Sequence, residues 1–445
     1  MSDAARPTPE VESSCYQFDI AVIGAGPAGL AAASSAAEGG KRVVLLDDTP
    51  WLGGQIWRGE GGRRGSRPYR YWVERFRRSG ATLLDRTSVI AAPEPQVLLA
   101  EHPSGPREIR WKKLIVATGA RELFLPFPGW TLPGVFGPGG LQALVKNGWP
   151  VSGQRVVIAG TGPLLLAVAG GLKKHGAVIV STNEQSSWKR VAGFGLHLLA
   201  HPEKLLQGAG IRLRLGASPY RCGTWPLRVE GAGRVQRVTL TNGARTWMEE
   251  CDVLACGFGL VPNIELPLAL GCSLQEGFAR VDEWQATSIP DVYCVGEITG
   301  IGGADCAIAE GQIAGHAAAG EFAKAEALFA DRASWHEFRQ AMAKAFALRA
   351  ELKTLATEDT LLCRCEDVTL GRVRKFHGWR DAKLQTRCGM GACQGRICGV
   401  ASQVLLGWGM ESVRPPVLPA RVASLISPDA TPASARQPNQ KTTTT

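Results

Sequence analysis

Short apolar runs that end in glycine-rich turns recur along this chain, and stretches of small residues follow them. Residues 20–23 form the first run, and an alanine-rich stretch after the glycine turn extends to Gly39-Gly40. Residues 41–46 form a second, mostly apolar run. Such runs predict buried parallel strands, and the alanine-rich stretch between them predicts a crossover helix. The pattern therefore predicts a β-α-β unit over residues 19–46.

The first turn has the spacing Gly24-x-Gly26-x-x-Gly29. Gly24 permits a tight turn, Gly26 lets the backbone approach a pyrophosphate, and Gly29 lets the helix pack closely on the strand. The helix start then presents free N–H groups to the phosphates. We expect Asp47, about 20 residues further on, to meet a ribose hydroxyl, with Asp48 as the adjacent alternative. The glycine spacing alone is weak evidence, but its strand-turn-helix context predicts a dinucleotide site.

Two further segments fit a flavin-adenine site. The loop at residues 51–57 contains a glycine pair that suits a backbone passing close under a flavin or adenine, and we expect Gly54 and Gln55 to contact the cofactor. The run at residues 113–117 ends in a tight turn at Thr118 and Gly119. Its position, about ninety residues after the first strand, is typical of the second dinucleotide contact in flavoproteins with two nucleotide-binding domains.

Another apolar run, at residues 291–295, ends in Gly296 and Glu297, and a helix of small residues is predicted over residues 304–320. An acid at this strand end can hydrogen-bond a ribityl hydroxyl. The start of the helix can face the flavin ring or the phosphates.

A second strand-turn-helix unit begins at residue 154 and predicts a second nucleotide-binding-type domain. Leu165 stands where the third glycine would be, which would push the helix away from its strand. The next strand is predicted at residues 177–180, and its tip has no acid or arginine at the immediate end. These departures disfavour NAD(P)H binding, so we expect the domain to have lost the nicotinamide role or to hold another nucleotide.

Five of the chain's twelve cysteines lie between residues 363 and 398, which indicates a metal or cluster site. Thiolates are ligands of both zinc and iron–sulfur clusters. The Cys-x-Cys spacing is too tight for the usual zinc knuckle and favours a compact iron–sulfur cluster; structural zinc and plain packing are the alternatives. Five cysteines compete for four ligand positions: Cys363, Cys365, Cys388, Cys393 and Cys398.

The length and composition of the chain limit the number of domains and the classes of protein to which it can belong. A chain of 445 residues is too long for one core and suggests two to four domains. No apolar run reaches the length of a membrane span, and the start lacks the features of a secretory signal, so we expect a cytoplasmic protein. The arginine-rich stretch at residues 63–78 is a solvated face or a docking site for an acidic partner; nothing else supports nucleic-acid binding, and we expect none.

A flavin together with a cluster of thiolates argues for electron transfer. The seven histidines fall in no recognisable catalytic motif, and no residue is assigned a catalytic role. We therefore predict a redox relay whose substrate is handled elsewhere.

Three motifs, in this order and spacing, resemble those of the glutathione-reductase-like FAD superfamily: Gly24-x-Gly26-x-x-Gly29, Ala117-Thr118-Gly119 and Val295-Gly296-Glu297. Most members have Asp where Glu297 stands. The cysteine region resembles the bacterioferritin-associated-ferredoxin-like [2Fe–2S] domain. That resemblance implies four cluster ligands, with Cys388 as the alternate: Cys363, Cys365, Cys393 and Cys398.

The resulting fold class is α/β, with two Rossmann-like dinucleotide-binding domains, the second inserted in the first, and a small C-terminal helical [2Fe–2S] domain. The expected segments are a disordered tail (1–16), the two parts of the FAD domain (17–125 and 251–320), the inserted domain (126–250), a helical connector (321–357), the [2Fe–2S] domain (358–425) and a second disordered tail (426–445).

This domain order resembles the alpha subunit of bacterial heteromeric amine dehydrogenases, which include opine oxidases for octopine or nopaline, D-hydroxyproline and proline dehydrogenases, and hydrogen cyanide synthase. Residues 128–135 and 160–167 look like that family too. The resemblance implies a D-amino-acid-oxidase-like FAD beta subunit that oxidises a C–N bond, with a small third subunit as a further option.

The resemblance also implies electron flow to a respiratory acceptor, with FMN at the subunit interface or another nucleotide in the second domain as open options. Membrane association would then come through the complex. The rival interpretations are an NAD(P)H-dependent flavoprotein reductase that serves a ferredoxin-like acceptor, and an iron or cluster carrier.

Overall fold

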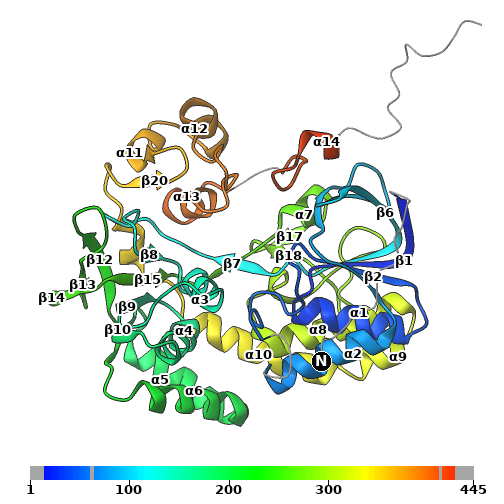
Figure 1. Cartoon of the computed structure of the whole chain (residues 1–445), viewed down its shortest axis with the longest axis horizontal. Coiled ribbons are helices and arrows are strands. Elements are labelled where there is room, and N and C mark those ends of the chain that lie inside the picture. The colour runs from blue at the N-terminus through cyan, green and yellow to red at the C-terminus, as the bar shows by residue number, and fades with distance from the viewer. Residues whose placement is uncertain (1–14, 61–64, 410–412, 426–445) are drawn as a thin grey trace, which may run out of the picture.

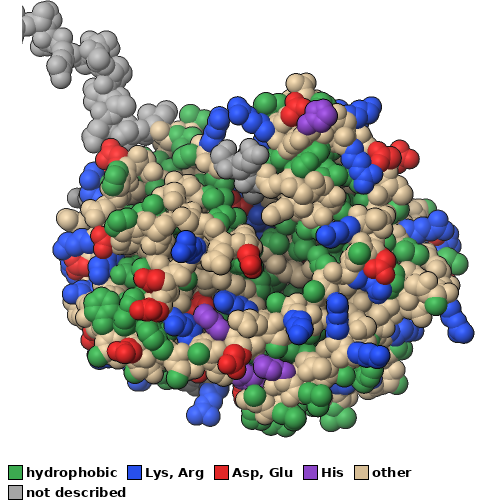
Figure 2. All heavy atoms as spheres, turned by 180° about the vertical axis from the view of Figure 1, so that it is seen from behind, with side chains coloured by type: hydrophobic (Ala, Val, Ile, Leu, Met, Phe, Trp, Pro, Cys, Tyr) green, Lys and Arg blue, Asp and Glu red, His purple; other side chains and the backbone are tan. Residues whose placement is uncertain are grey.

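The computed structural model describes residues 15–60, 65–409 and 413–425. Figure 1 shows two lobes that each contain a sheet, with a small group of helices, α11 (Leu370–Val373) to α13 (Cys398–Leu406), beside the second lobe. Seen from behind, the surface is hollowed between the lobes (Figure 2). Of the two expected tails, residues 1–14 and 426–445 lie outside the described residues, whereas Cys15 and Tyr16 begin the first strand.

The first lobe is built on a seven-stranded sheet in the order β3-β2-β1-β6-β5-β4, with β19 also paired to β6. The first strand, β1 (Cys15–Ile23), pairs in parallel with β2 (Val43–Leu46) and with β6 (Gly105–Val116). Its last four residues are buried, as expected for a strand covered on both faces. The other strands are β3 (Thr82–Leu84), β4 (Ser88–Ala91), β5 (Val97–His102) and β19 (Val292–Cys294).

Two helices rich in small residues, α1 (Pro27–Glu38) and α8 (Gly303–Ala319), pack on each other beside this sheet. They approach so closely that a Cβ added at Gly311 would lie 2.2 Å from the backbone oxygen of Ala28. A residue without a Cβ is therefore required at position 311. The outer helices of this lobe are α2 (Arg67–Ser79), α7 (Glu265–Ala269), α9 (Phe322–Glu326) and α10 (Phe329–Ala345).

The second lobe repeats the strand-turn-helix pattern around the five-stranded sheet β11-β10-β9-β15-β8. Leu165 is buried in the core of this lobe with residues of α3 and α4. A three-stranded antiparallel sheet, β12-β13-β14, and the helices α5 and α6 complete the lobe. The elements are β8 (Val135–Phe136), α3 (Pro138–Lys146), β9 (Arg155–Gly160), α4 (Leu164–Lys174), β10 (Val178–Glu184), α5 (Trp188–His197), α6 (Pro202–Leu215), β11 (Tyr220–Cys222), β12 (Trp225–Glu230), β13 (Arg237–Thr241), β14 (Thr246–Glu250) and β15 (Val253–Gly257).

Two strands that connect the lobes, β7 (Ala120–Glu122) and β16 (Leu260–Pro262), pair as antiparallel strands. The cysteine-bearing segment then forms a short hairpin and three helices around a core of its own. Trp130 of the second lobe donates a 2.7 Å hydrogen bond to the backbone of this segment at Leu361. Its elements are β20 (Leu361–Cys363), β21 (Val368–Thr369), α11 (Leu370–Val373), α12 (Trp379–Thr386) and α13 (Cys398–Leu406).

These features confirm the predicted α/β class with Rossmann-like folding. The residue boundaries proposed for the domains remain a prediction. Within the described residues, we find no helix with both the length and the apolar character needed to span a bilayer.

Candidate functional site

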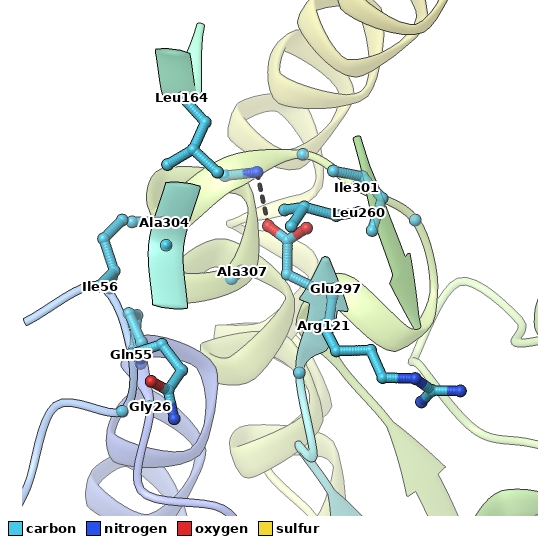
Figure 3. Close-up of a pocket in the computed structure, with 18 of the residues that line it drawn as sticks. Gly26, Gln55, Ile56, Arg121, Leu164, Leu260, Glu297, Ile301, Ala304 and Ala307 are labelled. Atoms are coloured by element: carbon cyan, nitrogen blue, oxygen red, sulfur yellow. Dashed lines mark hydrogen bonds between the residues drawn. The ribbon is translucent and has the colours of Figure 1, made fainter. Parts of the chain in front are cut away.

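A cavity of about 2570 Å³ lies at the junction of the two lobes. Part of its lining is shown in Figure 3. Eight of the ten predicted cofactor-binding residues line it: Gly24, Gly26, Asp47, Gly54, Gln55, Thr118, Gly119 and Glu297. The other two, Gly29 and Gly296, are absent from the lining.

The glycine turn leaves open space where a bound phosphate is expected. A Cβ at Gly26 would meet no atom within 4 Å, whereas a Cβ at Gly54 would lie 2.9 Å from the Cα of Gly26. The two backbones therefore lie against each other at the edge of the cavity. With the start of α1 directed at this space, the arrangement fits an anionic pyrophosphate.

Asp47 stands directly after β2 and holds the glycine turn in place. Its Oδ2 accepts a 2.6 Å hydrogen bond from the Ala25 N–H, and its Oδ1 accepts from the N–H and the hydroxyl of Thr49 at 2.8 and 2.6 Å. Oδ2 keeps one acceptor position for a ribose hydroxyl. The neighbouring Asp48 also lines the cavity, and burial followed by the Asp47 charge raises its pKa.

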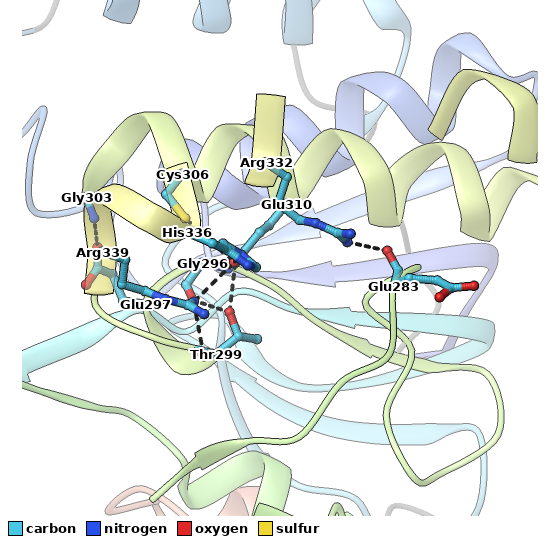
Figure 4. Close-up of polar contacts among 10 residues, drawn as sticks. All are labelled: Glu283, Gly296, Glu297, Thr299, Gly303, Cys306, Glu310, Arg332, His336 and Arg339. Atoms are coloured by element: carbon cyan, nitrogen blue, oxygen red, sulfur yellow. Dashed lines mark hydrogen bonds and ion pairs between the residues drawn. The ribbon is translucent and has the colours of Figure 1, made fainter. Parts of the chain in front are cut away.

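Glu297 has a buried carboxylate oxygen that fits a ligand hydroxyl. Its Oε1 accepts a 2.8 Å hydrogen bond from the Gly303 N–H at the start of α8 (Figure 4). Its Oε2 is buried and has no hydrogen-bond partner in the described chain. Burial raises the pKa of Glu297 to about 7. A buried acceptor without a partner is costly, so a hydroxyl donor from a ligand such as the ribityl chain of FAD fits this position.

Glu297→Gln is expected to change how stability depends on pH in the FAD-free chain. Between about pH 5 and 7 the folded chain keeps a proton on Glu297 that the unfolded chain has released, so stability falls as pH rises. The variant should therefore exceed the wild type in unfolding free energy by up to about 3 kcal/mol at pH 8 and match it near pH 4, below the ordinary pKa of a glutamate. Chemical denaturation at both pH values measures this. The exposed Glu326→Gln is the control, and a difference that is the same at both pH values would contradict the prediction.

A buried carboxylate, Glu310 on α8, supports the Gly296–Glu297 turn (Figure 4). Its Oε2 accepts hydrogen bonds from the Gly296 N–H at 2.8 Å and the Thr299 hydroxyl at 2.7 Å. Its Oε1 lies 2.9 Å from His336 Nε2 and 3.5 Å from Arg339 Nη1, both on α10. The Cys306 sulfur lies close enough to Glu310 and His336 for the three to hold a metal ion. The Arg339 guanidinium, however, already balances the charge of the Glu310 carboxylate. This group therefore anchors α10 to the cofactor turn.

The strand that follows the second glycine turn and its helix, β10, is longer than predicted. The strand expected to end at residue 180 continues to Glu184, so an acid does stand at its end, which corrects the sequence interpretation. Glu184 Oε2 accepts from the Gly162 N–H at 2.7 Å and its Oε1 from the Thr161 hydroxyl at 2.9 Å. Burial raises its pKa. The apolar pattern does not extend to this strand end because Ser181 to Asn183 are polar although buried.

The segment after α10 lies directly on this second turn. The Thr161 hydroxyl lies 3.3 Å from the backbone oxygen of Phe346, and the Gln185 amide donates to that of Ala347 at 3.2 Å. Arg349 in turn donates from its backbone N–H to Gln185 Oε1 at 3.1 Å. The chain's own backbone therefore occupies hydrogen-bonding groups at and beside the second turn.

The five clustered cysteines come together in the folded chain. The sulfurs of Cys363, Cys388 and Cys398 lie within 4.8 Å of one another. Hydrogen bonds from the Cys388 and Cys398 thiols lower the pKa of Cys363, and contact with Cys398 and Cys365 lowers that of Cys393. A cavity of about 250 Å³ is lined by the four predicted ligands, together with aromatic residues of the second lobe. Cys388 is fully buried and is absent from that lining. Four thiols around one space fit a small iron–sulfur cluster, and the ligand choice remains a prediction.

The sequence profile of the family described as "Pyridine nucleotide-disulphide oxidoreductase" matches residues 18–311. The chain belongs to this family. It is accordingly an oxidoreductase and a flavoprotein, and family membership implies FAD as its flavin.

Relatives extend the similarity beyond the matched residues. This oxidoreductase is 32% identical over 422 residues to the HcnB subunit of hydrogen cyanide synthase from Pseudomonas aeruginosa, covering 85% of this chain and 90% of the relative. It is 31% identical over 463 residues to the A-type subunit of opine oxidase from Rhizobium meliloti, covering 92% and 99%. These matches confirm the predicted resemblance to such subunits. The solved structure of L-proline dehydrogenase from P. horikoshii has the same fold, with a TM-score of 0.66, 22% identity, and 94% and 81% coverage.

Sequence reasoning missed one polar contact between the two predicted centres. Arg121 follows the Thr118-Gly119 turn, and Arg396 lies between two of the predicted cluster ligands. Both contact Glu265 in the folded chain. No local pattern marks these residues, because the first and last are 275 positions apart in the sequence.

Proposed function

We propose that this chain is the electron-transfer FAD/[2Fe–2S] subunit of a heteromeric, dye- or quinone-linked dehydrogenase. The complex would oxidise the C–N bond of an opine or an imino or amino acid, such as octopine, nopaline, D-hydroxyproline or proline. The substrate is oxidised mainly on a partner FAD subunit of the D-amino-acid-oxidase-like type. The names of the relatives, which are subunits of hydrogen cyanide synthase and opine oxidase, support this assignment.

One observation carries the proposal: the cavity that holds the predicted flavin contacts extends to the cysteine-bearing segment. Arg121 and Arg396 line the same cavity as Gly26 and Glu297. FAD, when bound, exchanges electrons in pairs or singly, and a [2Fe–2S] cluster carries one electron at a time. This chain's residues would hold the two groups near each other. That arrangement suits a relay.

In the described part of the chain, the cavity lining shows no histidine that is free to act as an acid or base. His336 is the one histidine among the described residues that line it, and it is paired with Glu310. A relay with its substrate site on another subunit is consistent with this lining.

The NAD(P)H-dependent reductase is the weaker alternative. It requires the second glycine turn to receive a nicotinamide dinucleotide, and the contacts of Phe346 to Arg349 with Thr161 and Gln185 compete with that role. An iron or cluster carrier would not need the flavin contacts that line the large cavity.

Purification of the chain from its native cell extract tests the proposal. We expect an amine-oxidase-like flavoprotein to copurify, and the complex to reduce a dye with one member of a panel of opines and imino acids. The isolated chain should lack that activity. Oxidation of the substrate by the isolated chain at the rate of the complex would contradict the proposal.

A further inference from the structure

Three charged side chains meet between the flavin turn and the cysteine-bearing segment; we call Arg121, Glu265 and Arg396 the arginine junction. Arg121 lies on β7, Glu265 begins α7, and Arg396 lies in the loop that leads to α13. Glu265 Oε1 lies 3.0 Å from Arg121 Nη1 and 3.9 Å from Arg396 Nε. The three side chains are only 15%, 12% and 21% exposed, so water screens their charges weakly.

The junction also joins the two centres through hydrogen bonds. The Thr118 hydroxyl donates to the backbone oxygen of Asn263 at 2.8 Å, and the Asn263 amide returns a 2.8 Å bond to the backbone oxygen of Thr118. Arg121 donates to Asn263 Oδ1 at 2.7 Å and to the backbone oxygen of Arg396 at 3.2 Å. One residue therefore contacts both the support of the flavin turn and the loop between Cys393 and Cys398.

The orientation of Arg121 agrees with this role. In Figure 3 its guanidinium points away from Gly26 and Gln55, on the other side of Glu297. Burial lowers the pKa of Arg121, while Glu265 and Cys393 act in the opposite direction. With one carboxylate between two guanidinium groups, the junction places a net positive charge beside the predicted cluster ligand Cys393.

We infer that the arginine junction is a positioning device for electron transfer: it fixes the loop of residues 393–398 against the flavin turn and supplies positive potential at the cysteine centre. The inference rests on the proposed function. Arg121 and Glu265 act through the loop and its charge environment, so they are positioning residues. Positive charge stabilises a cluster that has gained an electron, and removal of the positive charge destabilises this reduced cluster.

The direction in which the reduction potential of the cluster shifts distinguishes this role from a purely structural contact between the domains. The full-length holoprotein and the variants Arg121→Gln, Arg121→Lys and Glu265→Gln are titrated redox-potentiometrically, with the cluster's EPR signal as readout. Arg121→Gln should shift the cluster potential to more negative values, and Glu265→Gln should shift it to more positive values. Arg121→Lys, which keeps the charge, should lie closer to the wild type than Arg121→Gln.

Arg155→Gln is the control, because Arg155 is likewise an arginine in ion pairs, with Glu250 and Asp252, but in the second lobe. It should leave the cluster potential unchanged. Shifts of the same sign in Arg121→Gln and Glu265→Gln, or no shift in either, would overturn the electrostatic role.

Hydrogen exchange of the iron-free full-length chain tests the positioning role without the cofactors. The amides of residues 393–398 should exchange at least about tenfold faster in Arg121→Gln than in Arg155→Gln, which corresponds to about 1.4 kcal/mol of lost protection. Equal protection would overturn that role. Absence of iron and of an EPR signal in the wild type would contradict the proposed function instead, and the exchange result would still decide whether the loop is fixed.

Discussion

Replacement of Gly26 by alanine is expected to give a folded chain that binds FAD more weakly. The backbone angles of Gly26, φ −71° and ψ −176°, are accessible to alanine, and the added Cβ would meet no atom of the chain within 4 Å. The methyl group would instead take the open space at the edge of the cavity, where the pyrophosphate is expected. We expect FAD affinity to fall about tenfold or more, because overlap with a bound phosphate costs more than about 1.4 kcal/mol. Flavin absorbance per chain and thermal unfolding are the measurements.

Gly29→Ala is the contrasting variant at the same turn. A Cβ at Gly29 would lie 1.7 Å from the backbone oxygen of Gly24, so helix α1 would have to move away from β1. The free energy of unfolding should then fall by more than about 3 kcal/mol, since a clash with backbone exceeds ordinary overpacking. Wild-type FAD content in Gly26→Ala, or wild-type stability in Gly29→Ala, would contradict the predicted division of roles between the two glycines.

The second large effect is expected at the cysteine centre. Cys363→Ser should abolish iron and acid-labile sulfide binding, because Cys363 lines the small cavity with the other three predicted ligands. Cys388→Ser should keep two iron ions per chain, because Cys388 is buried outside that lining. Iron and sulfide analysis with EPR measures both variants.

The paired design makes the ligand assignment testable, because both thiols are buried and lie near each other. Loss of the cluster in Cys388→Ser together with its retention in Cys365→Ser or Cys393→Ser would contradict the assigned set and make Cys388 a ligand.

The parts of the fold that sequence alone predicts are those encoded within short segments. The spacing of Gly24, Gly26 and Gly29 predicts the turn because these glycines act within one β-α-β unit, where a Cβ at Gly29 would meet Gly24. The clustered cysteines are likewise local, and the structure brings four of them to one cavity.

What the sequence misses depends on contacts between distant segments or on buried polar residues. The apolar pattern places the end of β10 too early because Ser181, Thr182 and Asn183 interrupt it. They are nevertheless buried, and the Asn183 side chain bonds to the backbone of β9 at Ile158. The contact of Phe346 with the second glycine turn forms only on tertiary folding, and so does the arginine junction. No periodicity in the sequence therefore indicates either of them.

An anaerobic absorbance titration of the purified chain tests the relay most directly. We predict that NADH and the opine or imino-acid substrate leave the flavin of the isolated chain oxidised. Addition of a catalytic amount of the partner subunit with substrate should then bleach the flavin, and the cluster's EPR signal should rise. Rapid bleaching of the isolated chain by NADH, or by the substrate without the partner, would contradict the account.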